Sequence, residues 1–94
     1  MKSAYELAMD RLAAAQPAVN LSDEQKHRIA DIEAKCKADI AAKELLLGGE
    51  MDKARATGDA EAMAQLQRQF ADETRRFEEK REREKDAVRA ESQT

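Results

Sequence analysis

Large apolar residues recur at helical spacings of three, four, seven or eleven positions along two stretches of the chain, 23–56 and 60–90. The first stretch carries Ile29, Ile32, Cys36, Ile40, Leu47 and Met51, and the second carries Met63, Leu66, Phe70, Phe77 and Val88. Such spacing places apolar side chains on one face of an α-helix. The steps in the first stretch add to eleven rather than seven, so the pattern predicts two long helices without strong left-handed supercoiling.

Capping residues and helix breakers predict where the helices begin and end. Ser3 to Glu6 and Ser22 to Gln25 both have the form of a capping box, in which a serine hydroxyl accepts from a backbone amide one turn ahead. Pro17 cannot continue a helix, and Gly58 followed by Asp59 suits the end of one helix and the start of the next. We therefore predict one helical domain over 1–94, with a helix over 4–16, a connector over 17–22, a helix over 23–56, a turn over 57–59, a helix over 60–90 and a loose tail over 91–94.

A tight turn at Gly58 makes the two long helices antiparallel neighbours. Facing residues of an antiparallel pair have a constant sum of residue numbers. A sum of 117 places every large apolar residue of the second helix opposite an apolar one: Ala54 with Met63, Met51 with Leu66, Leu47 with Phe70, Ile40 with Phe77, and Ile29 with Val88. The apolar pattern therefore predicts a long antiparallel hairpin that resembles a coiled coil.

The same register leaves the open end of the hairpin short of apolar cover, because Ile32 falls opposite Lys85 and Cys36 opposite Arg81. We expect the first helix to fold back over this end. The expected contacts are Leu12 with Ile29, Met9 with Ile32, and Tyr5 with Cys36. The predicted fold is all-α: a long hairpin with a short N-terminal helix packed on its open end.

Composition narrows the class of protein. Nineteen of the 94 residues are alanine, only 20 are larger apolar residues, and 39% are charged, which is typical of long helices and disfavours a compact β-rich core. The 17 basic and 20 acidic residues are interleaved, so we expect no nucleic-acid binding. No apolar run is long enough for a membrane span or a secretory signal, and the single cysteine fits a reducing compartment. We expect a cytoplasmic protein that does not bind membranes.

Two features offer limited support for ligand chemistry. Glu24 and His27 form an E-x-x-H, the spacing that helical bundles use to bind metal ions, but the chain has one histidine and such sites need more ligands. Cys36 is a thiol without a second cysteine nearby. A small metal-binding or ligand-binding bundle that uses Glu24 and His27, or Cys36, is the alternative interpretation. We expect no catalytic residues, no metal and no cofactor, and the chain is not predicted to be an enzyme.

Self-association is the favoured interpretation. Leu7, Leu45 and Leu46 are apolar residues that the predicted hairpin leaves uncovered, and Gly48-Gly49 lies beside two of them, where a second backbone can approach closely. A two-fold dimer would bury these five residues in one self-complementary surface. We expect a structural or interaction protein: a homodimeric hairpin that acts as a scaffold or adaptor and presents a helical surface to a protein partner.

Overall fold

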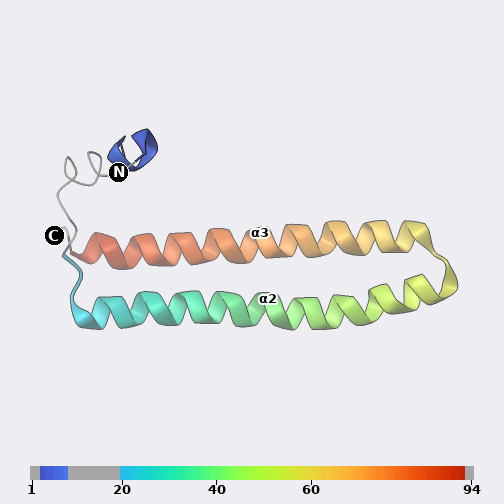
Figure 1. The fold of residues 1–94 in the computed structure, drawn as a ribbon. Coiled ribbons are helices and arrows are strands. Elements are labelled where there is room, and N and C mark those ends of the chain that lie inside the picture. Colours follow the sequence, from blue (N-terminus) through green and yellow to red (C-terminus); the bar gives the residue numbers. More distant parts are fainter. Residues whose placement is uncertain (1–2, 9–19, 93–94) are drawn as a thin grey trace.

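The computed structural model describes residues 3–8 and 20–92, and the regular elements of this part of the chain are all helices (Figure 1). Two long helices, α2 (Asp23–Thr57) and α3 (Ala60–Glu91), lie side by side in opposite directions and are joined by a tight turn. A short helical stretch over 4–8 precedes them. The predicted all-α hairpin is confirmed, and each long helix ends within one residue of its predicted boundary.

Serine side chains cap the starts of α2 and of the N-terminal helical stretch. The Gln25 amide donates to Ser22 Oγ at 3.1 Å and the Ser22 amide donates to Gln25 Oε1 at 2.8 Å, which completes the predicted capping box of α2. The Glu6 amide donates to Ser3 Oγ at 3.2 Å at the start of the N-terminal stretch. Each bond satisfies an amide that has no partner within its own helix.

The turn between the helices is built on Gly58, whose φ of 69° lies in the left-handed region that favours glycine. The Asp59 amide donates to the Ala54 carbonyl at 2.9 Å and the Gly58 amide donates to that of Arg55 at 3.2 Å, the pair of bonds that defines a Schellman motif. Asp59 then caps α3 by accepting from the Ala62 amide at 3.0 Å. One glycine and one aspartate therefore end α2, reverse the chain and start α3.

The core of the hairpin is a single line of side chains between α2 and α3. Its most buried members are Cys36, Leu47, Ala54 and Val88, and Leu47 is only 5% exposed. Most of the other apolar residues along this line, including Ile40 and Phe77, are half-buried. In a pair of helices each interface side chain packs against one neighbouring helix and has solvent on both flanks, so the core is narrow.

Polar contacts between the helices confirm the predicted register. The residue numbers add to 117 for Gln25 and Ser92, whose Oε1 and Oγ lie 2.9 Å apart. They add to 116 for Lys43 and Glu73, 118 for Glu33 and Lys85, and 119 for Arg28 and Glu91. The side-chain pairs therefore lie within two residues of the predicted register, and the two side-chain bonds to backbone carbonyls, from Gln25 to Val88 and from Cys36 to Phe77, lie within four.

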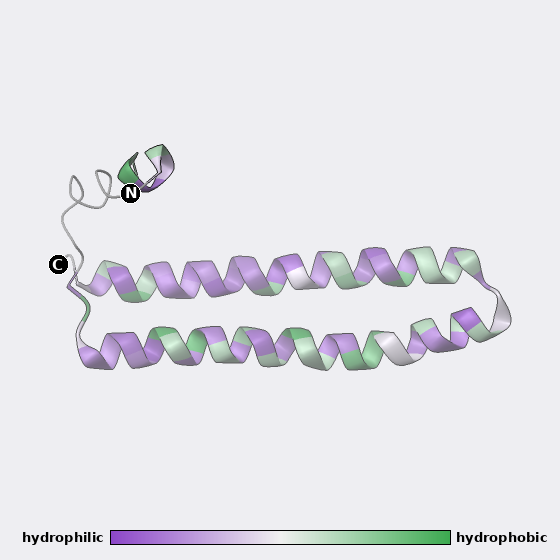
Figure 2. Cartoon of the chain, in the orientation of Figure 1, coloured by the Kyte–Doolittle hydropathy of each residue, from purple (hydrophilic) through white to green (hydrophobic). Residues whose placement is uncertain are grey.

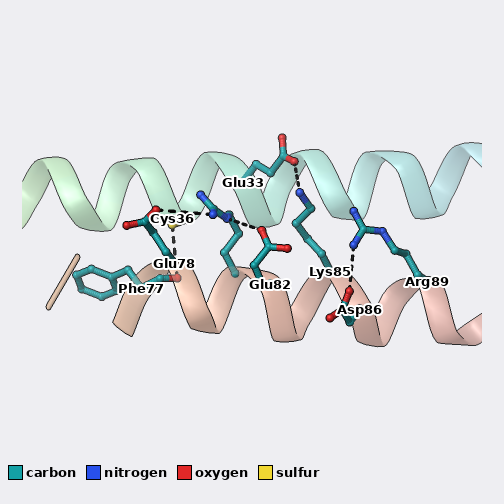
Figure 3. Close-up of polar contacts among 9 residues, drawn as sticks. Glu33, Cys36, Phe77, Glu78, Glu82, Lys85, Asp86 and Arg89 are labelled. Atoms are coloured by element: carbon teal, nitrogen blue, oxygen red, sulfur yellow. Dashed lines mark hydrogen bonds and ion pairs between the residues drawn. The ribbon is translucent and has the colours of Figure 1, made fainter. Parts of the chain in front are cut away.

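The structure closes the open end of the hairpin differently from our expectation (Figure 3). Tyr5 is 73% exposed, so the predicted contact of Tyr5 with Cys36 is wrong. The Cys36 thiol instead donates to the carbonyl of Phe77 at 3.5 Å. Lys85 lays its stem along the interface, where its side chain is only 13% exposed, and its Nζ reaches Glu33 Oε1 at 2.6 Å. The expected contacts of Met9 and Leu12 lie outside the described residues.

The cross-helix ion pairs predict how stability changes with pH. The Lys85 ammonium lowers the pKa of the Glu33 carboxyl below its ordinary 4.5 by hydrogen bonding and by its charge, and Arg28 lowers the pKa of Glu91 in the same way. A carboxyl whose pKa is lowered on folding stabilises the fold above its unfolded pKa and loses that contribution as pH falls through the folded pKa.

We therefore expect the free energy of unfolding, measured by urea denaturation, to fall as the pH drops below about 4.5. Glu33→Gln should be less stable than the wild type at neutral pH, because Lys85 loses its partner, and its stability should fall less on acidification. Equal slopes of stability against pH in the two proteins would contradict a contribution of this pair.

Candidate self-association surface

One side of α2 faces away from α3 and carries small and apolar residues, with Asp31 and Asp52 among them. Residues two apart on a helix point about 200° apart, so the burial of Leu47 against α3 directs Leu45 to the opposite side, where it is 82% exposed. Leu46 lies at the edge of that side and is 60% exposed. In the colouring by hydropathy, the middle of α2 contains a concentration of apolar residues (Figure 2).

Small residues extend this apolar region in both directions along α2. The spacing of eleven that governs the core also governs this side, since Ala34, Leu45 and Ala56 lie eleven apart, as do Ala38 and Gly49. We define the outer face of α2 as Ala34, Ala38, Ala41, Ala42, Leu45, Gly48, Gly49 and Ala56, which are exposed except for the half-buried Gly48. An eleven-residue spacing keeps both faces straight along a regular helix, so α2 presents one apolar face to α3 and a second one outward.

Gly48 and Gly49 lie within a continuous α2, and the helix neither breaks nor changes its conformation there. A Cβ atom placed on either residue would meet no atom within 4 Å outside the helix's own backbone. Glycine in a helix interior destabilises it by about 1 kcal/mol relative to alanine. Nothing within the described hairpin offsets this cost, because no neighbouring group occupies the space that the absent side chains leave.

The centre of the outer face is a shallow depression. Leu45, Gly48 and Gly49 line it together with Ala41, Glu44 and Asp52. Charged side chains near its edge are paired along the helix, with Arg55 Nη1 at 3.0 Å from Asp52 Oδ1 and Lys53 Nζ at 3.6 Å from Glu50 Oε1. The depression is therefore mixed in character: apolar side chains and glycines line it together with the carboxylates of Glu44 and Asp52.

The five predicted interaction residues do not all share this surface. The structure places Leu45, Gly48 and Gly49 together, with Leu46 at their edge. Leu7 is exposed on the N-terminal helical stretch and does not line the depression. The alanines of the outer face were missed from the sequence, although their spacing of eleven from Leu45 and Gly49 was a readable signal.

The residues of the alternative interpretation lie apart. Glu24 and His27 are exposed near the start of α2, on the solvent side, whereas Cys36 is buried against α3. His27 and Cys36 are nine residues apart, which directs them to opposite sides of the helix. In the described part of the chain no group of three or more His, Cys, Asp or Glu side chains is arranged to hold a metal ion.

Neither described long helix has the length and apolar character that crossing a membrane requires. Comparison of the chain with protein-family models, with curated proteins and with solved structures yields no match. The hairpin itself and the outer face of α2 are therefore the features from which a function can be inferred.

Proposed function

We propose that this chain is a non-enzymatic structural protein, a helical hairpin that self-associates as a homodimer and acts as a scaffold or adaptor. The observation that carries the proposal is the second apolar face of α2, with Leu45 at 82% exposure in its centre. A helix that packs only against α3 needs a single apolar face. The second face is suited to another helix.

The identity of the residues supports a second copy of the chain as the partner. The outer face is long, straight and rich in small apolar residues, and Glu50 and Asp52 at its rim are each paired with a basic side chain, so it presents no strong positive or negative field to a charged ligand. Glycine and alanine allow two helices to approach more closely than larger residues do. A two-fold dimer buries such a face with itself and needs no other component.

Sedimentation equilibrium at micromolar concentration tests the proposal. We expect the wild type to sediment at twice 10.5 kDa. Leu45→Glu should weaken association by about 100-fold or more, because each dimer would bury two unpaired carboxylates. Its helical content should remain that of the wild type, since Leu45 makes no contribution to the interface with α3.

Ala71→Glu is the matched control. Ala71 is exposed on α3, and a glutamate there lies four residues before Arg75, a favourable spacing. The control adds the same charge and should leave the dimer intact. A wild type that is monomeric, fully helical and cooperative in unfolding would contradict the proposal, because the narrow core would then be sufficient within one chain.

A further inference from the structure

The outer face of α2 has a bulky residue one turn away from a hollow. Leu45 projects from the helix and is 82% exposed, and Gly49, four residues later on the same side, has no side chain and open space above it. Because the two residues are one turn apart, a second α2 that runs in the opposite direction can place its own Leu45 over this glycine. We infer that two copies pack antiparallel through the outer faces of α2, with Leu45 of each chain seated on Gly49 of the other; this inference rests on the proposed self-association.

This arrangement fixes the register of the interface. Pairing Leu45 with Gly49 sets the sum of facing residue numbers at 94 and places the two-fold axis at the level of Leu47. The same sum brings Ala38 opposite Ala56 of the other chain, on the centre line of the face. Leu45 then meets a glycine and Ala38 meets another alanine, so the two backbones can stay close at these positions.

A parallel two-fold pair would lack this complementarity. Its axis runs along the helices, so every residue faces its own copy: Leu45 meets Leu45 and Gly49 meets Gly49. The two leucines would hold the backbones apart beside the glycines and leave a gap there, which costs the contacts of its lining.

Charge also favours the antiparallel arrangement. In a parallel pair Asp52, whose side chain is 75% exposed at the rim of the depression, would lie level with the Asp52 of the other chain. Two like charges at short distance repel, and the repulsion grows as water is excluded. In the antiparallel register Asp52 faces Ala42, and the dipoles of the two helices oppose each other.

Because α3 covers the opposite side of α2, the dimer is a layer of four helices in the order α3, α2, α2, α3. The two α2 helices form its centre, and the charged solvent faces of α3 form its outer edges. In this layer the outer face of α2 is covered over residues 37–57, the part that contains Leu45 and the two glycines.

Disulfide formation between two different variants tests the orientation. Ala38→Cys and Ala56→Cys are each prepared in a Cys36→Ser background, one carries a mass tag, and circular dichroism checks that both are folded. Mixed in an oxidising glutathione buffer, they should form a disulfide with each other and not with their own copies. Residues 38 and 56 are 18 positions apart, about 27 Å along a helix, far beyond the distance that a disulfide can span.

The other possible outcomes test the antiparallel packing and the self-association separately. Disulfides that join each variant only to itself would show parallel packing and overturn the inference. A protein that sediments as a dimer and forms no disulfide between the two variants would also overturn it, while self-association would stand. A monomer by sedimentation would overturn both.

Discussion

Replacement of Leu47 by alanine is expected to lower the free energy of unfolding by about 2–5 kcal/mol, the range for large core truncations. Leu47 is 5% exposed and is the most buried large side chain of α2. The core is one residue wide, so neighbouring side chains have little freedom to fill the space that the substitution leaves. Urea denaturation monitored by circular dichroism measures the loss.

Leu45→Ala is the matched control, because it makes the same chemical change two residues away on the exposed side of the same helix. At a concentration at which the wild type is monomeric, Leu45→Ala should leave the stability unchanged or raise it slightly, since alanine has the higher helix propensity. At a concentration at which the wild type is dimeric, it should lower the stability. Equal losses for the two variants at low concentration would show that the assignment of the two faces of α2 is wrong.

Replacement of both Gly48 and Gly49 by alanine is expected to change folding and association in opposite directions. The two methyl groups meet nothing in the hairpin, so the monomer should gain about 1–2 kcal/mol of stability from helix propensity. In the dimer the same methyl groups fill the space that the partner's backbone and Leu45 require. The dissociation constant should therefore increase, and sedimentation equilibrium measures it alongside thermal unfolding at low concentration.

Gly58→Ala provides the contrast in the same chain. Gly58 has positive φ, which a side chain disfavours, so this substitution should destabilise the monomer and leave the outer face of α2 unchanged. If Gly48→Ala/Gly49→Ala stabilised the monomer and left association unaffected, the two glycines would have no part in a contact between chains.

The course of the hairpin was predictable because its determinants are local. Ser22 with Gln25 and Gly58 with Asp59 satisfy backbone groups within a few residues of themselves, so their side chains alone indicate where a helix begins or ends. The register was predictable for a different reason. Once the turn is placed at Gly58, an antiparallel pair has few ways to bring Leu47 and Val88 into one line.

The closure of the open end was not predictable from apolar pattern alone. The predicted register places Lys85 opposite Ile32. An apolar pattern counts the whole lysine side chain as polar, so it indicated that Ile32 lacks an apolar partner on α3. Its aliphatic stem nevertheless lies along the interface and its ammonium reaches Glu33. Such contacts depend on the rotamers of long side chains, and the spacing of residues does not determine these.

The candidate surface was predicted in part. Leu45, Leu46, Gly48 and Gly49 were identified because leucine and glycine stand out in a charged helix. The alanines around them were overlooked because alanine is common on any solvent face and is the best helix former. Only the placement of Leu47 against α3 settles which side of α2 these alanines occupy.

The interactions between α2 and α3 differ between the two ends of the hairpin. Polar contacts between the helices occur at Lys43 and at positions farther from the turn, at Glu33, Arg28 and Gln25. Salt screens exposed ion pairs more than it affects apolar packing. Among these contacts Arg28 with Glu91 is the most exposed ion pair, so rising ionic strength should weaken the open end of the hairpin more than the half beside Gly58. Cys36 is buried in the half farther from Gly58 and is the single cysteine of the chain. The rate at which a thiol reagent labels Cys36 therefore measures how often this half opens.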